Sequence, residues 1–252
     1  MIREIRKKMV ILHNRMPFKE GVRTHLRDLE AREWVYMNLR LSGSSLSREN
    51  IDTILDGGWI LAASIEEHVL IERLGQLRSY MYRQADMGAD LSLRILSEMH
   101  RIITGNEEEF SEEYRKGSPL LLEYGVTPML AADIPAAMKQ VAEYAAGKSD
   151  GNGAAQDQGE SEIFLKAARI HNRILEIWPY REGSQILARA AMYYCLAQKG
   201  YPLAALELTE QEYNRQVISY LKGGSSQSLA EVLVRAVYHR LELMIQLTAY
   251  EI

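Results

Sequence analysis

Apolar residues recur along most of this chain at the three- and four-residue spacing of an amphipathic helix, whereas strand-like alternation is almost absent. This spacing predicts helices over residues 2–12, 19–39, 48–56, 65–84, 93–104, 135–146, 162–177, 184–198, 210–222 and 228–249. The segment 112–135 lacks the helical period, and Gly and Pro residues interrupt it. Within it, residues 120–122 are the best strand candidate, as half of a hairpin.

Capping residues and a Gly-rich stretch set the expected ends of several helices. Ser47 is expected to cap the helix that follows it, and either Asp90 or Ser92 to cap the helix that stops at Gly105. Residues 147–159 are polar and rich in Gly, which predicts a mobile surface loop within the domain.

Composition narrows the function classes. The chain has 252 residues, of which 47% are apolar and 25% charged, as is usual for a soluble globular protein. A net charge of −4 argues against nucleic acid and anionic membranes as partners. No apolar run approaches the ~20 residues that span a bilayer, and the run at the N-terminus is too short for a signal peptide. With Cys195 as the only cysteine, an intramolecular disulfide is excluded. We expect a cytoplasmic protein.

The segment 177–189 carries the candidate chemistry, because it joins two predicted helices through Pro, Glu and Gly. A loop that opens directly into a helix presents unpaired backbone N–H groups and the positive end of the helix dipole, which suits a phosphate. Glu182 could hold magnesium together with phosphates and waters, or it could be a solvated loop acid.

The segment resembles the signature loop of the Fic (Fido-domain) family, His-Pro-Phe-x-(Asp/Glu)-Gly-Asn-Gly-Arg-x-x-Arg. The matching positions are Pro179, Glu182, Gly183 and Arg189, with Tyr180 in place of Phe. The departures are Trp178 for the His, Ser184 for the Asn, Gln185 for the second Gly and Ile186 for the first Arg. The order of other family-like segments agrees, at residues 41–47, 96–103, 114–135, 167–171 and 188–202.

The resemblance implies a fold and a division of the chain. The expected fold class is mainly α, a Fic-like helical bundle around residues 184–198 with a small β-hairpin flap. Residues 1–90 would form an N-terminal helical region that includes the inhibitory-helix-like segment. Residues 91–222 would form the Fic-like core with the flap and the signature loop, and residues 223–252 a C-terminal helix that packs on it. The whole would be a single compact domain.

The resemblance also implies a chemistry that this chain has largely lost. In the family the loop His is the base for a target hydroxyl, the acidic residue holds a metal, and the usual product is a protein carrying AMP. Trp178 occupies the base position, and an indole N–H only donates. Gln185 places a side chain where a pyrophosphate needs bare backbone, and Ile186 lacks the fork that binds the terminal phosphate. No residue of this chain is therefore assigned as catalytic.

Two interpretations stay open for most loop residues. Trp178 either packs in the core or fills the pocket, and Gly183 either approaches a ligand or only turns the chain. Ser184 is expected to cap the helix rather than touch a substrate. Arg189 binds an anion or forms an ion pair with a neighbouring acid. The nucleotide-binding candidates are Pro179, Tyr180, Gly183, Ser184, Gln185 and Arg189, and the metal candidate is Glu182.

Positions outside the loop are interpreted in the same way. Relatives with an inhibitory helix carry a Glu that pairs with the first loop Arg. Here Ser42 and Ile186 stand at those positions, so both halves of that pair are absent. His100 and His171 are expected to be satisfied core residues, and Cys195 to be inert packing.

The function expected is that of a degenerate Fic-domain protein that lacks AMP transfer and binds a protein partner or a nucleotide. The alternative is an active nucleotidyl or phosphoryl transferase of altered chemistry that uses Glu182 and the helix N-terminus. The resemblance implies magnesium as a cofactor if a nucleotide binds. If no nucleotide binds, no cofactor is expected. A regulator that binds nucleic acid is disfavoured by the acidic balance.

Overall fold

The computed structural model describes residues 1–106, 114–121, 124–148 and 160–249. The helices are α1 (Ile2–Arg15), α2 (Glu20–Arg40), α3 (Arg48–Leu55), α4 (Ile65–Asp86), α5 (Leu93–Thr104), the short 3-10 helix η1 (Ala131–Asp133), α6 (Ile134–Ala145), α7 (Glu160–Ile177), α8 (Ser184–Ala197), α9 (Glu210–Leu221) and α10 (Gln227–Ala249). The expected mainly helical fold is confirmed, and each predicted helix is present. None of the described helices is both long and apolar enough to cross a membrane.

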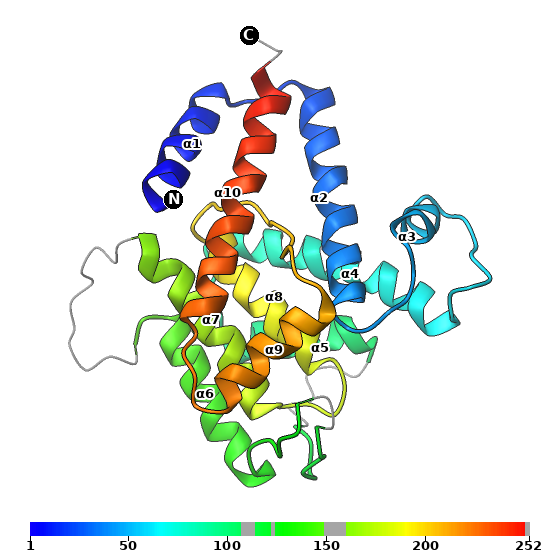
Figure 1. The fold of residues 1–252 in the computed structure, drawn as a ribbon, viewed down its shortest axis with the longest axis vertical. Coiled ribbons are helices and arrows are strands. Elements are labelled where there is room, and N and C mark those ends of the chain that lie inside the picture. The colour runs from blue at the N-terminus through cyan, green and yellow to red at the C-terminus, as the bar shows by residue number, and fades with distance from the viewer. Residues whose placement is uncertain (107–113, 122–123, 149–159, 250–252) are drawn as a thin grey trace.

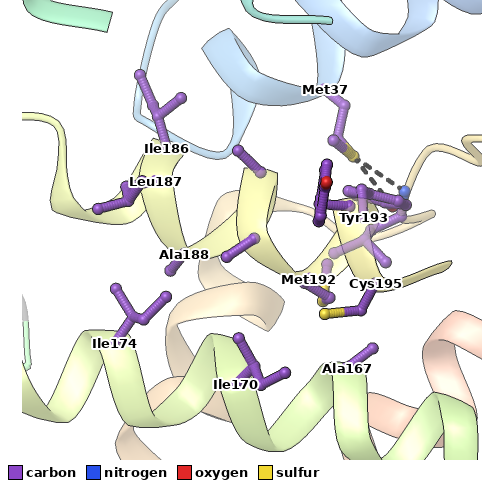
Figure 2. Close-up of a cluster of buried hydrophobic side chains, with 14 of the residues drawn as sticks. Met37, Ala167, Ile170, Ile174, Ile186, Leu187, Ala188, Met192, Tyr193 and Cys195 are labelled. Atoms are coloured by element: carbon purple, nitrogen blue, oxygen red, sulfur yellow. Dashed lines mark hydrogen bonds between the residues drawn. The ribbon is translucent and has the colours of Figure 1, made fainter. Parts of the chain in front are cut away.

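Helix α8 lies at the centre of the bundle, as its uniformly apolar sequence predicts. From Ile186 to Leu196 its side chains are buried, and α7, α4 and α5 pack around it. Figure 2 shows Ala167, Ile170 and Ile174 of α7 facing the apolar side chains of α8. Small residues such as Ala167 and Ala188 let these two helices approach closely. At one end of the molecule α1, α2 and α10 extend together beyond this core (Figure 1).

The local capping signals are confirmed at two helix starts and one helix end. The Ser47 hydroxyl accepts a hydrogen bond from the Asn50 backbone amide, and Asn50 Oδ1 accepts one from the Ser47 backbone amide, which completes a capping box. Ser92, rather than Asp90, caps α5. At the end of α5, Gly105 adopts a φ of 68° that glycine tolerates without strain.

The small β-hairpin flap is not confirmed. The described residues contain no strand, only an isolated antiparallel bridge between Leu121 and Val126. The turn at Gly125, with φ of 62°, directs the buried side chains of Leu121 and Tyr124 against the core. The segment is therefore held by side-chain packing more than by a strand ladder. The domain boundaries stay a prediction, and most of the predicted loop 147–159 lies outside the described residues.

A buried polar chain crosses the bundle from α7 to α9 and α10. His171 is fully buried, and its ring nitrogens lie 2.9 Å from Asn172 Oδ1 and 2.7 Å from the Tyr213 hydroxyl. Because the amide oxygen only accepts, Nδ1 carries the proton and Nε2 accepts from Tyr213. Asn172 in turn donates to Ser226 at 3.0 Å. His171 is thus the satisfied core residue that the sequence predicts.

This burial makes stability depend on pH. Desolvation lowers the pKa of His171 from 6.5 to about 4, so the unfolded chain binds this proton more tightly than the folded one. The contribution is complete above pH 6.5, and we expect about 3 kcal/mol to be lost as the pH falls to about 4. Urea unfolding at a series of pH values measures the slope. His171→Gln should flatten it and the exposed His13→Gln should not; an unchanged slope in His171→Gln would contradict the assignment.

Candidate functional site

The Trp178 loop, residues 178–183, connects α7 to α8. Its first residue has an unusual backbone: Trp178 has φ of 49°, although its amide still donates to the Ile174 carbonyl at 2.8 Å. Pro179 follows, and a residue before proline is disfavoured in the α-helical region. The helix therefore ends here, and the chain turns sharply toward α8. Gly183, with φ of 77°, makes the second turn and precedes the first residue of α8.

An aromatic side chain covers the start of α8. Tyr124 is 2% exposed, its ring meets the half-buried Trp178 edge-to-face at 5.9 Å, and its hydroxyl accepts a hydrogen bond from Gln185 Nε2 at 2.8 Å. Trp178 thus packs against Tyr124, and Gln185 is engaged with the same residue. Tyr124 could not be identified from the sequence, because it lies 61 residues from its partner Gln185.

Ser184 does not cap α8, so that prediction is wrong. Its hydroxyl donates to the Tyr180 carbonyl at 2.9 Å and accepts from the Tyr180 amide at 3.1 Å. The N-cap position belongs to Gly183, and no side chain caps the helix there. Ser184 is the first residue of the helix, so its hydroxyl bonds to the backbone of Tyr180, which precedes it in the loop. This links the end of the loop to its beginning.

His100, in α5, contacts the loop directly. It is only partly buried, so it is not enclosed in the core. Its ring stacks on Tyr180 with centroids 3.5 Å apart, and Nε2 donates to the Glu182 carbonyl at 3.0 Å. Partial burial lowers its pKa, so the ring is neutral at pH 7. These contacts fix the loop backbone while the Glu182 side chain is exposed. The described residues contain no group of three or more His, Cys, Asp or Glu that could bind a metal.

Arg189 does not form the predicted ion pair with a neighbouring acid among the described residues, and its binding of an anion stays a prediction. It is fully buried, and its guanidinium donates to Asn38 Oδ1 at 2.8 Å and to the Ser42 hydroxyl at 2.7 Å. No carboxylate pairs with it in the part of the chain that the structure describes, and its Nη1 has no hydrogen-bond partner there. The guanidinium also lies over the ring of Tyr213, at 5.4 Å. The predicted ion pair is therefore replaced by neutral hydrogen bonds.

Ser42 contacts Arg189 and not position 186, which corrects the pairing expected from the resemblance. Ile186 is only 7% exposed and belongs to the apolar core. Asn38 and Ser42 come from the end of α2 and the turn after it, so this contact connects the N-terminal helices to α8.

Arg115 is a further residue of the site whose role the sequence did not reveal. Its guanidinium donates to the Trp178 carbonyl at 2.6 Å, to the Ile177 carbonyl at 3.0 Å, and to the carbonyls of Gly117 and Met129. Its own amide donates to the Pro179 carbonyl at 3.0 Å. Arg115 thereby joins the segment 114–130 to the end of α7.

Two cavities lie away from the loop. One, of about 1160 Å³, lies between α1, α2, α4 and α10, and the other, of about 450 Å³, lies between α2, α10 and residues 205–209. Neither is lined by a residue of the Trp178 loop. The loop is held by its own hydrogen bonds and by His100, and it exposes one carboxylate, that of Glu182.

Residues 90–196 match the model of the Fic/DOC family. No curated protein matches the sequence. Among solved structures, the fold is similar to a Fic domain containing signaling protein from Bacteroides thetaiotaomicron VPI-5482, with a TM-score of 0.78, 18% identity, and 99% of this chain and 98% of that chain covered. It is also similar to Fic-1 from C. elegans (TM-score 0.74, 16% identity, 99% and 73% covered) and to a Fic family protein from Desulfovibrio desulfuricans G20 (0.68, 15%, 100% and 74%).

Proposed function

Residues 90–196 of this chain belong to the Fic/DOC family, and from that premise we propose that the protein is a degenerate member that binds a protein partner or a nucleotide and does not transfer AMP. Transfer to a hydroxyl needs a group that accepts its proton. Trp178 stands at that position, and its indole N–H cannot accept one. The ring of His100 stacks on Tyr180, and its Nε2 donates to the Glu182 carbonyl, so this nitrogen is not available to take that proton.

The observation that carries the proposal is the cover over the start of α8. The hydrogen bond from Gln185 to Tyr124, and the packing of Tyr124 on Trp178, place side chains at the helix N-terminus that would receive phosphates. Binding a pyrophosphate there requires Tyr124 to leave a position where it is 2% exposed, which costs the buried contacts of an aromatic ring. Of the two ligands, a protein partner is favoured over a nucleotide.

Magnesium is implied by the family resemblance, and Glu182 is the residue that could hold it. A single exposed carboxylate binds magnesium only when phosphates and waters complete the shell. In this chain the metal would therefore depend on the nucleotide.

Calorimetric titration of the protein with a panel of nucleotides, with and without magnesium, tests the proposal. We expect no magnesium-dependent binding with a Kd below about 1 mM. The double variant Tyr124→Ala with Gln185→Gly should gain such binding, because it uncovers the start of α8. Glu182→Ala added to that variant should remove it. Magnesium-dependent binding to the unaltered chain would contradict the covered site.

A second candidate is a transferase of altered chemistry, and one observation favours it. No side chain caps α8, and the Glu182 carboxylate is exposed beside it, so the charges that position phosphates are partly retained. Incubation with ATP labelled at the α-phosphate and a cell extract would reveal labelled protein. Label that disappears in Glu182→Ala would establish this candidate over the first.

A further inference from the structure

The connection between α2 and α3 contains four serines whose side chains have different surroundings. The Ser44 hydroxyl donates to the Glu67 carboxylate at 2.6 Å, and Ser47 caps α3. The Ser42 hydroxyl instead accepts a hydrogen bond from the guanidinium of Arg189, with 2.7 Å between the oxygen and Nη2. Ser42 is therefore the serine of this connection whose hydroxyl is bonded to a positive charge.

Arg189 is a buried cation whose described partners are all uncharged. Its side chain is 0% exposed, and besides Ser42 it donates to Oδ1 and to the carbonyl of Asn38, at 2.8 and 3.3 Å. The guanidinium lies 5.4 Å from the centre of the Tyr213 ring, and its Nη1 has no hydrogen-bond partner among the described residues. Taking a charge out of water costs free energy that neutral hydrogen bonds only partly offset. A negative charge placed beside Arg189 should therefore stabilise the fold.

Ser42 connects this buried guanidinium to the surface. Asn38 and Tyr213 are fully buried, whereas Ser42 is exposed in the turn that follows α2. A protein that modifies hydroxyl groups can therefore reach Ser42 Oγ from solvent, and a group added to this oxygen lies next to the guanidinium of Arg189.

Other charged side chains near the turn have smaller effects on a group at Ser42. Arg40 donates to two backbone carbonyls and adds a second positive charge. The exposed Glu210 carboxylate lies beside the turn, and Glu67 is engaged by hydrogen bonds at the start of α4. Water and salt screen an exposed carboxylate such as Glu210 much more than a buried guanidinium. The attraction of Arg189 for an anion at Ser42 should therefore exceed the repulsion by Glu210.

We propose that Ser42 is a phosphorylation site, and that its phosphate pairs with Arg189 and fastens the turn after α2 to α8. A phosphate carries a charge of about −1.5 to −2 at pH 7, and its oxygens accept charge-assisted hydrogen bonds from a guanidinium. This pair would replace the neutral hydrogen bond that now joins the N-terminal helices to α8 at Ser42. The inference goes beyond the function proposed above and does not depend on nucleotide binding at the Trp178 loop.

The phosphoryl group comes from a nucleoside triphosphate that a separate serine kinase binds. The Ser42 hydroxyl oxygen attacks the terminal phosphorus, and an O–P bond forms while the bond to the leaving nucleoside diphosphate breaks. A base of that kinase takes the hydroxyl proton.

The full chain with phosphoserine incorporated at Ser42 tests the pairing, and the matched control carries phosphoserine at the exposed Ser45 of the same connection. Phosphorus NMR over a pH series measures the second pKa of each phosphate, which is about 6 without a partner. Because a guanidinium favours the dianion, we expect this pKa to be lower at Ser42 than at Ser45 by at least about 1. Phosphate at Ser42 should also raise the midpoint of thermal unfolding by about 3–6 °C, and phosphate at Ser45 should not.

Two substitutions identify the partner of the phosphate at Ser42. Arg40→Gln leaves Arg189 in place and should keep most of the pKa difference, whereas Arg189→Gln should remove it. Far-UV circular dichroism checks that both variants fold, and the comparison of Ser42 with Ser45 needs no substitution in the core. Equal pKa values at the two serines overturn the proposal. So does a difference that is lost in Arg40→Gln, because the phosphate then pairs with a surface arginine.

Mass spectrometry tests whether the site is used. Trypsin cleaves after Arg40 and Arg48, so the four serines lie on one peptide, residues 41–48, whose fragments locate a phosphate. In the chain isolated from the cells that produce it, we expect phosphate on Ser42. An unmodified peptide, or one that carries phosphate only on the other three serines, overturns the assignment of Ser42.

Discussion

Replacing Arg115 by methionine should lower the free energy of unfolding by about 3–5 kcal/mol. The guanidinium donates to four backbone carbonyls, those of Gly117, Met129, Ile177 and Trp178, and Arg115 is only 8% exposed. Methionine fills a similar space but donates nothing, so these carbonyls lose their partner where water reaches them poorly. Urea unfolding followed by circular dichroism measures the loss.

Two further variants separate this role from a general loss of charge. Arg115→Lys keeps the positive charge but cannot reach all four carbonyls at once, so it should recover only part of the stability. Arg181→Met removes an exposed arginine from the Trp178 loop, whose carbonyls Arg115 contacts, and it should change stability by no more than about 0.5 kcal/mol. Equal effects of Arg115→Met and Arg181→Met would show that the carbonyl contacts contribute little.

Arg115 also fixes the position of Trp178, because it bonds the carbonyl of a residue whose φ is positive. In Arg115→Met, the indole should therefore become more accessible to the quencher acrylamide under conditions where the chain remains folded. Trp34 is fully buried and Trp59 lies on another loop, so Trp178→Phe in the same background identifies the source of the change.

Replacing Gly183 by alanine should lower the free energy of unfolding by about 2–4 kcal/mol, from two separate causes. The φ of 77° is strained for any residue with a Cβ, at a cost of about 1–2 kcal/mol. A Cβ here would also lie 2.9 Å from Ile103 Cγ2, which forces α5 and the loop apart and adds about 1–2 kcal/mol.

Gly200 provides the matched control for this variant. Its φ is 76°, nearly the same, but a Cβ would meet nothing within 4 Å. Gly200→Ala should thus show the backbone cost alone, and the difference between the two variants measures the close approach of Gly183 to α5. Thermal or urea unfolding of both proteins makes the comparison. If the two substitutions cost the same, the contact with Ile103 is not tight.

The sequence by itself predicted the helices, because their signals are local. Apolar spacing along α8 and α7, and the caps at Ser47 and Ser92, depend on residues within a few positions of one another. The identity of each loop residue was likewise readable, so the absence of a base at Trp178 needed no structure.

The local sequence could not decide which of two nearby hydrogen-bond partners a side chain takes. Ser184 could either cap a helix or bond backward, and the choice followed from the φ of Gly183, which makes Ser184 the first helical residue. The predicted hairpin is not confirmed: among the described residues Leu121 and Val126 form a single bridge, and the side chains of Leu121 and Tyr124 pack into the core.

Only the tertiary structure decided which distant residues meet. The partner of Arg189 is Asn38, 151 residues away, and the cover of the α8 start is Tyr124 from another segment. Such pairs depend on how whole helices pack, and no spacing along the chain encodes them. The sequence therefore determined the helices and the identity of each residue in the Trp178 loop, whereas packing determined which side chains contact that loop and that, among the described residues, Arg189 is held without a carboxylate.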